Sequence, residues 1–91
     1  MATHKSAMKR ARQNQVRRAR NRAVKSRVKH VVKKVRLAVE HKSVDEARAA
    51  LQEAIPVIDR AASKGTIHKR TASRKISRLS KKVHALASQQ G

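Results

Sequence analysis

The first forty residues of this chain are strongly basic. Residues 1–39 contain fourteen Lys or Arg, and the first acidic residue is Glu40. The stretch also lacks Pro and Gly, so no residue in it breaks a long helix. In its second half, apolar residues recur at the four- and three-residue spacing of one helix face, at Val24, Val28, Val31, Val35 and Ala38. These features predict one long helix over residues 5–41.

The apolar face of this helix ends before the helix does. Followed toward the N-terminus, the same face carries Asn21, Arg17, Asn14 and Arg10. About twenty residues, roughly 30 Å of helix at about 1.5 Å per residue, therefore have little apolar surface to bury against protein. We expect residues 1–22 to form a basic helical extension, which needs a partner attracted to positive charge.

A second helix is predicted after residue 43. Ser43 and Glu46 match the capping box, in which Ser43 caps the helix and the Glu46 side chain reaches back to the N–H of Ser43. The apolar face is centred on Ala47, Leu51, Ala54, Ile58 and Ala61, and it is broadened on both sides by Ala50, Ile55, Val57 and Ala62. Pro56 points away from this face, and because the apolar spacing continues across it we expect one bent helix rather than two short ones. Gly65 then ends the helix with a left-handed backbone.

A third helix follows, with an apolar face made of Ala72, Ile76, Leu79, Val83 and Leu86. Three helices joined by two short turns predict an all-α fold, an antiparallel three-helix bundle with a long, overhanging N-terminal helix. We expect one domain over residues 1–91, made of the basic extension (1–22), the bundle (23–87) and a frayed tail (88–91).

The net charge of +20 is distributed unevenly along the chain. Residues 1–39 carry +14, residues 40–59 have two basic and five acidic residues, and residues 60–91 carry +9 without an acid. Such a charge favours a polyanionic partner, most commonly nucleic acid. The chain has no Phe, Tyr or Trp to stack on splayed bases. We therefore expect contacts to the phosphates and groove shape of a double-helical or compactly folded nucleic acid.

Other functional classes find little support in the sequence. The absence of Cys suits a cytosolic protein, and the longest apolar stretch, around residues 55–58, is too short to span a membrane. An Arg-rich, acid-free start also occurs in mitochondrial transit peptides, but here it lacks a continuous apolar face. The five His are not spaced as metal ligands, and no nucleophile, acid–base pair or glycine-rich loop is present. We expect no enzyme activity, metal, cofactor or small-molecule substrate.

The candidate nucleic-acid-binding residues are mainly the Lys and Arg of the two basic segments, since a merely solvated helix face normally mixes both signs of charge. In the N-terminal helix they are Lys5, Lys9, Arg10, Arg12, Arg17, Arg18, Arg20, Arg22, Lys25, Arg27 and Lys29. Toward the C-terminus they are Lys64, Lys69, Arg70, Arg74, Lys75, Arg78, Lys81 and Lys82. Lys69 and Arg70 have the wrong sign for a helix start, so either a phosphate binds there or the fold tolerates the mismatch.

Three blocks of the sequence resemble the bacterial small-subunit ribosomal protein S-twenty family. The first is KSAMKRARQN at residues 5–14, continued by Arg17, Arg18 and Asn21. The second is PVIDR at residues 56–60. The third begins at Gly65 and includes IHK at residues 67–69, Ala72, Arg74 and SRL at residues 77–79. Together the blocks extend over essentially the whole chain.

The resemblance implies a three-helix bundle that binds small-subunit (16S) ribosomal RNA directly and early in assembly. The implied contacts are with the 5′ domain and the long penultimate helix of that RNA, by a protein that is monomeric among other small-subunit components in cytoplasmic ribosomes. The resemblance adds polar residues to the RNA-binding candidates, namely Ser6, Gln13, Asn14, Asn21 and His68. Where the family pattern has Asn after residues 68–69, this chain has Arg70, which removes a side-chain hydrogen bond and strengthens phosphate contact.

Composition alone also allows a histone-like DNA-binding protein, which competition between folded ribosomal RNA and duplex DNA at fixed salt separates from the RNA-binding alternative. A membrane-surface or calmodulin-target helix requires bulky apolar anchors, whereas the first helix has valines and almost nothing apolar before Val24. A coiled coil between copies of the chain is unnecessary, because the three apolar faces can pack against one another.

Overall fold

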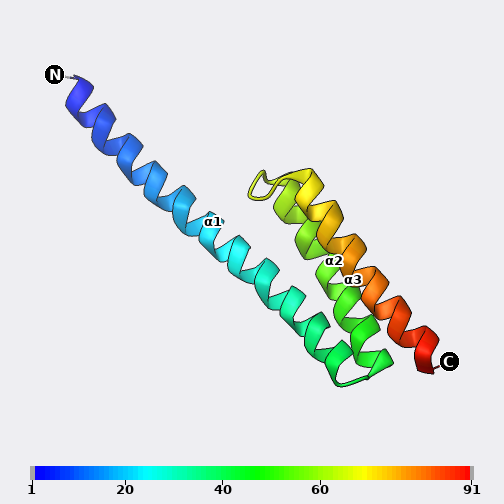
Figure 1. Ribbon diagram of the computed structural model, residues 1–91. Helices are drawn as coiled ribbons and strands as arrows, with labels where there is room; N and C mark the ends of the chain where they lie inside the picture. Colours follow the sequence, from blue (N-terminus) through cyan, green and yellow to red (C-terminus); the bar gives the residue numbers. More distant parts are fainter. Residues whose placement is uncertain (1, 91) are drawn as a thin grey trace.

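The computed structural model describes the backbone of residues 2–90 and the side chains of residues 6–89. Three helices form this part of the chain: α1 (Ala2–Glu40), α2 (Val44–Ser63) and α3 (Lys69–Gln90). Consecutive helices run antiparallel, and α1 continues well beyond the turn that joins α2 to α3 (Figure 1). The predicted all-α bundle with an overhanging first helix is therefore confirmed. Fraying of residues 88–91 stays a prediction, since α3 is helical to Gln90.

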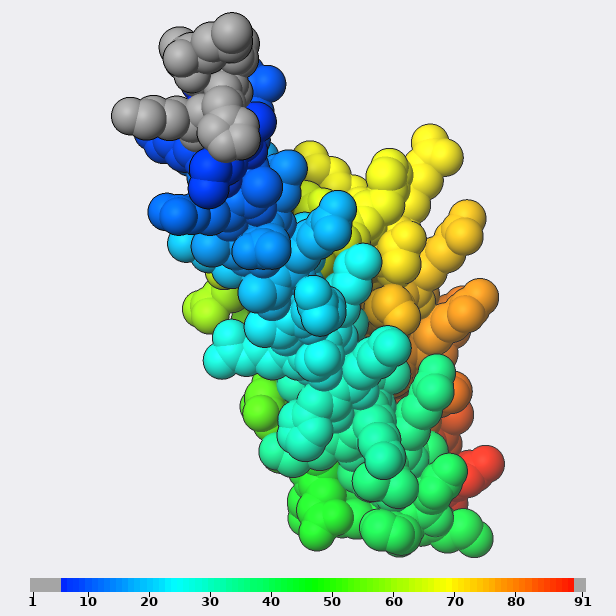
Figure 2. Space-filling model, turned by 90° about the vertical axis from the view of Figure 1, so that its left-hand side faces the viewer, coloured from blue at the N-terminus to red at the C-terminus, as the bar shows by residue number. Residues whose placement is uncertain are grey.

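The overhang, residues 2–22 of α1, makes the molecule strongly elongated. The principal extents are 70 × 21 × 14 Å, and the radius of gyration of 18.2 Å exceeds the value of about 12 Å expected for a compact domain of this length. Every described side chain from residue 6 to residue 23 is exposed, Val24 is half-buried, and Val28 is the first buried residue. Figure 2 shows the overhang projecting beyond the rest of the surface.

The core lies between the three helices and contains only aliphatic side chains. Ile58 and Val35 are its largest fully buried members, and no polar or charged residue among the described ones is buried. The buried residues are Val28, Val31, Val32, Val35, Ala38, Ala47, Ala50, Ala54, Ile58, Ala61, Ala72, Leu79, Val83 and Leu86. Because α2 contributes four alanines and one isoleucine, its backbone can approach both neighbours closely, and the core is shallow.

The predicted buried face of α2 is wrong at one position. Leu51 was expected at the centre of this face, but it is half-buried, whereas its neighbour Ala50, expected at the margin, is buried. Adjacent helical positions differ by about 100° around the axis, and the observed orientation of α2 turns Ala50 inward. Leu51 lies at the edge between α2 and α3, where it lines an open hollow with Val83. Ile76 of α3 is likewise half-buried and packs against the core from its edge.

The turn between α1 and α2 confirms only half of the predicted capping box. The Glu46 N–H donates to Ser43 Oγ at 3.4 Å, so Ser43 is the N-cap of α2. The Ser43 N–H, however, donates to the Ala38 carbonyl at 3.1 Å. The return bond from the Glu46 carboxylate is therefore not made, because the C-terminus of α1 already uses that donor. Lys42 adopts the left-handed φ of 57° that this helix end requires.

The turn between α2 and α3 follows the prediction. Gly65 has a φ of 77°, its N–H donates to the Ala62 carbonyl at 3.0 Å, and the Thr66 N–H donates to the Ala61 carbonyl at 2.9 Å. This pair of bonds is the Schellman ending of a helix. Pro56 is exposed inside a continuous α2, which confirms one helix rather than two.

Candidate nucleic-acid interface

The described basic side chains of the overhang are all exposed, and only the α2–α3 turn contacts the overhang, at its base beside Asn21. The side chain of Lys5 lies outside the described ones. The other candidates on α1 are all exposed: Ser6, Lys9, Arg10, Arg12, Gln13, Asn14, Arg17, Arg18, Arg20, Asn21, Arg22, Lys25, Arg27 and Lys29. A helix with cations on every side and no acid within reach can satisfy its charge only with an external anion.

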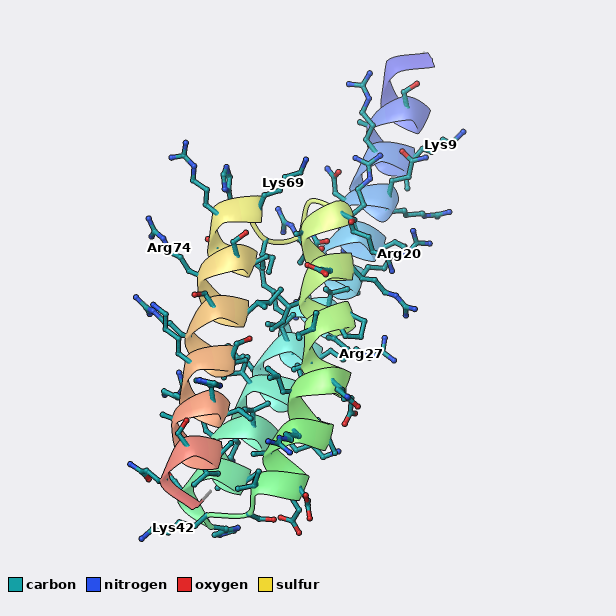
Figure 3. The ribbon with its side chains drawn as sticks, turned by 90° about the vertical axis from the view of Figure 1, so that its right-hand side faces the viewer. Lys9, Arg20, Arg27, Lys42, Lys69 and Arg74 are labelled. Carbon is teal, nitrogen blue, oxygen red and sulfur yellow. The ribbon has the colours of Figure 1, made fainter. Side chains whose placement is uncertain are left out.

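A second basic surface lies on the outer face of α3. Arg74, Arg78, Lys81 and Lys82 are exposed, while Lys75 is half-buried. Arg74 points away from α1 and α2, whereas Lys69 extends from the end of the bundle (Figure 3). The predicted site residues therefore do not form one patch: the α1 group and the outer α3 group belong to different sides of the molecule.

The start of α3 is capped by His68. Its Nδ1 accepts from the Arg70 N–H at 3.1 Å, and its carbonyl accepts from the Ala72 N–H at 3.0 Å. An accepting Nδ1 is unprotonated, so in the neutral ring the proton is on Nε2. One of the helix N–H groups that a phosphate could have met is thus already satisfied. His68, Lys69 and Arg70 remain exposed and can contact a phosphate through Nε2–H and the two cationic groups.

One candidate from the C-terminal half, Lys64, meets candidates of the overhang at the inside corner between the overhang and the α2–α3 turn. Thr66 Oγ1 lies 3.5 Å from Asn21 Oδ1 and donates to it. An open hollow of about 710 Å³ lies beside this contact, lined on α1 by Arg17, Arg20 and Asn21 and on the turn by Lys64, Gly65 and Thr66. Gly65 and Thr66 were not among the predicted binding residues, because their position beside α1 depends on tertiary packing.

Four of the five acidic residues lie away from this corner, between the end of α1 and the middle of α2, and the fifth is Asp59 in the second half of α2. Lys34 Nζ donates to Glu53 Oε2 at 2.9 Å, and both side chains are about half exposed. The hydrogen bond from Lys34, followed by its charge, lowers the pKa of Glu53 below the ordinary value. The positive charge of Lys34 is therefore balanced within the protein, unlike the charges of the overhang.

The described part of the chain offers few features for other chemistry. No group of three His, Cys, Asp or Glu side chains within it is placed to hold a metal ion. None of its helices is both long enough and apolar enough to cross a membrane. The hollow beside the overhang is open and is lined by Arg, Lys, Asn and Thr together with small apolar residues. That lining is suited to an anion.

Comparison with known proteins identifies the family of this chain. The family model described as "Ribosomal protein S20" matches residues 2–84. Small ribosomal subunit protein bS20 of Desulfatibacillum aliphaticivorans is 62% identical over 87 residues, 96% of this chain and 99% of that protein. The bS20 proteins of Trichlorobacter lovleyi (59% identical) and Syntrophobacter fumaroxidans (56%) each align over 94% of this chain, and over 99% and 100% of their own lengths. The chain therefore belongs to the ribosomal protein S20 family.

Proposed function

We infer that this protein is a structural, non-enzymatic component of the small ribosomal subunit and that it binds the ribosomal RNA of that subunit. Family membership supports the place in the subunit. The observation that carries the RNA-binding role is the overhang, an acid-free helix whose described side chains are all exposed. A ribosomal role in bacteria corresponds to a cytoplasmic location.

The proposed contacts are mainly salt links from Lys and Arg to RNA phosphates. Guanidinium groups can bind phosphate oxygens in pairs, and ammonium groups act as point charges. The chain has no aromatic side chain, so base stacking on Phe, Tyr or Trp plays no part. Recognition then depends on the shape of the folded RNA, on which phosphates must match charges fixed along two helices.

The two separate basic surfaces also support a proposal about which regions of the RNA the protein contacts. The overhang and the outer face of α3 are held by different helices, so each can contact a different RNA helix. We propose that these are in the 5′ domain and the long penultimate helix of 16S RNA. Hydroxyl-radical footprinting with full-length 16S RNA tests this, and protection confined to one of these regions contradicts it.

The phosphate contacts are tested by the salt dependence of binding. Log affinity should fall linearly with log salt, by about 0.9 per phosphate neutralised on a duplex. Arg17→Ala in the overhang and Arg78→Ala on α3 should each reduce the slope by about one unit and leave preference among RNA sequences nearly unchanged. Arg48→Ala is the matched control, because Arg48 is an exposed arginine of α2 outside the proposed RNA-binding residues.

Base recognition predicts a different result from the same measurement. The slopes of the two variants would equal that of the parent, and discrimination between RNA sequences would be lost. A DNA-binding role is tested by competition at fixed salt: duplex DNA that displaces folded 16S RNA at equal phosphate concentration contradicts the proposed function, since charge alone binds both.

A further inference from the structure

A second, smaller hollow adjoins the corner beside the overhang. It encloses about 90 Å³ between α1 and α2 and is lined by Arg27, Arg60 and Lys64 over Val24, Val57 and Ala61. The two hollows have Val24 and Lys64 in common, so they form one trough that runs from the corner into the groove between α1 and α2. We call it the basic trough, because five cationic side chains line it: Arg17, Arg20, Arg27, Arg60 and Lys64.

The register of α1 against α2 shows that this clustering of like charge is specific. Lys34 of α1 and Glu53 of α2 form an ion pair across the groove. Seven residues back along α1 and seven forward along α2, two helical turns in each case, the same antiparallel register brings Arg27 opposite Arg60. The next contact is between Asn21, six residues before Arg27 on α1, and Thr66, six residues after Arg60 in the turn that follows α2. This contact is consistent with the same register. The groove thus holds an ion pair at Lys34 and Glu53, and two helical turns nearer the overhang it holds two arginines, Arg27 and Arg60.

Two facing arginines repel each other unless an anion lies between them. No Asp or Glu is among the residues that line the two hollows, and Arg60 is exposed. The apolar floor provides no counter-charge. A phosphodiester group suits such a site, because it carries one negative charge and its two free oxygens can accept from guanidinium groups on opposite walls.

We propose that the basic trough binds the phosphate backbone of one ribosomal RNA strand, and that Arg60 is an RNA-binding residue supplied by α2. This rests on the proposed function and adds to it a third contact surface, on the helix that carries most of the acidic residues. The strand follows the groove from the overhang and ends at the Lys34–Glu53 pair, where the charge of the groove is balanced within the protein.

The test compares Arg60→Ala with Arg48→Ala in the full-length protein, using filter binding to full-length 16S RNA over a series of salt concentrations. Both residues are exposed arginines of α2, but only Arg60 lines the basic trough. Losing charge-assisted hydrogen bonds to a phosphate should weaken binding about tenfold for Arg60→Ala and reduce the salt slope by about one unit. Arg48→Ala should stay within about twofold of the parent.

A charge reversal separates RNA binding from a structural role of Arg60. Arg60→Glu places a carboxylate opposite Arg27, in the arrangement of the Lys34–Glu53 pair, so the free protein should melt at a slightly higher temperature. The same variant should bind RNA more weakly than Arg60→Ala, since it repels the phosphate. If Arg60 instead supports the fold, Arg60→Glu lowers both the melting temperature and the affinity, and the inference is wrong.

The outcomes for this inference and for the proposed function differ. Parental affinity and slope for Arg60→Ala, while Arg78→Ala still reduces the slope, would overturn the basic trough and leave the proposed function intact. Equal losses for Arg60→Ala and Arg48→Ala would also overturn it, because they would reflect overall charge alone. Parental slopes for both Arg60→Ala and Arg78→Ala would contradict the proposed function itself.

Discussion

Ile58 is the side chain on which the small core depends most. It is fully buried, whereas most core residues of α2 are alanines. Ile58→Ala should destabilise the protein by about 2–5 kcal/mol, from lost burial and the cavity left behind. Leu51→Ala, at the half-buried edge, should cost less than about 2 kcal/mol. Chemical denaturation followed by circular dichroism measures both, since the chain has no aromatic fluorophore.

Leu37→Ala is the control for these variants. Leu37 is 41% exposed, so the change should lie within about 0.5 kcal/mol of the parent. A cost for Leu51→Ala equal to that of Ile58→Ala would mean that α2 is rotated toward the originally predicted face.

Glu53 gives the stability a small dependence on pH. Its pKa is lowered in the folded protein, chiefly by the hydrogen bond from Lys34. The pair therefore stabilises the fold above the ordinary pKa of 4.5, and the contribution is lost as the pH falls through the lowered value. The melting temperature of the parent should exceed that of Glu53→Gln near neutral pH, and the difference should vanish in acid. A difference that stays constant down to strongly acidic pH would contradict this ion pair.

Some residues of the fold and of the candidate interface could be predicted from the sequence, and others could not. The exposed cations of α1 and α3 were predictable, because uninterrupted like charge along a helix excludes packing against protein. Arg60 was missed because the charge around it is acidic on average, and its partner across the groove depends on the register between helices. The apolar face of α2 was centred on Leu51 rather than Ala50 because both neighbours are apolar, so periodicity alone fixes the centre of a wide face only to within one position.

At the scale of elements, α1 is one helix in two environments. From Val28 onward its apolar face is buried, while the overhang has no packing partner. The absence of Pro and Gly predicted its continuity, but helix propensity alone gives little stability, and tertiary packing supplies most of it. We therefore expect amide protons of residues 6–20 to exchange quickly in the free protein and to become protected on 16S RNA.

The second half of the same helix is an internal control for this experiment. Amide protons of residues 28–38 should be protected in both states, because they belong to the packed bundle. Strong protection of residues 6–20 without RNA would show that the overhang is a stable helix by itself, and binding would then require no folding step.

At the scale of the whole molecule, we propose that residues 1–22 are a binding extension on a bundle that folds without them. A variant that lacks these residues loses eight Lys or Arg and no buried side chain among the described ones. Its melting temperature should stay close to that of the full chain or rise, since self-repulsion decreases. The salt slope for 16S RNA should fall by as much as about seven units. Loss of the cooperative melting transition would instead make the extension part of the folding unit.

The 70 Å length of the molecule also affects how it meets RNA before any contact forms. The overhang is densely positive, and most of the acidic residues lie toward the opposite end of the molecule, so a polyanion exerts a torque on the protein. Within a Debye length, about 8–10 Å at physiological salt, this torque turns the overhang toward the RNA. Encounters then start from one end of the molecule, which shortens the orientational search and raises the association rate as salt is lowered.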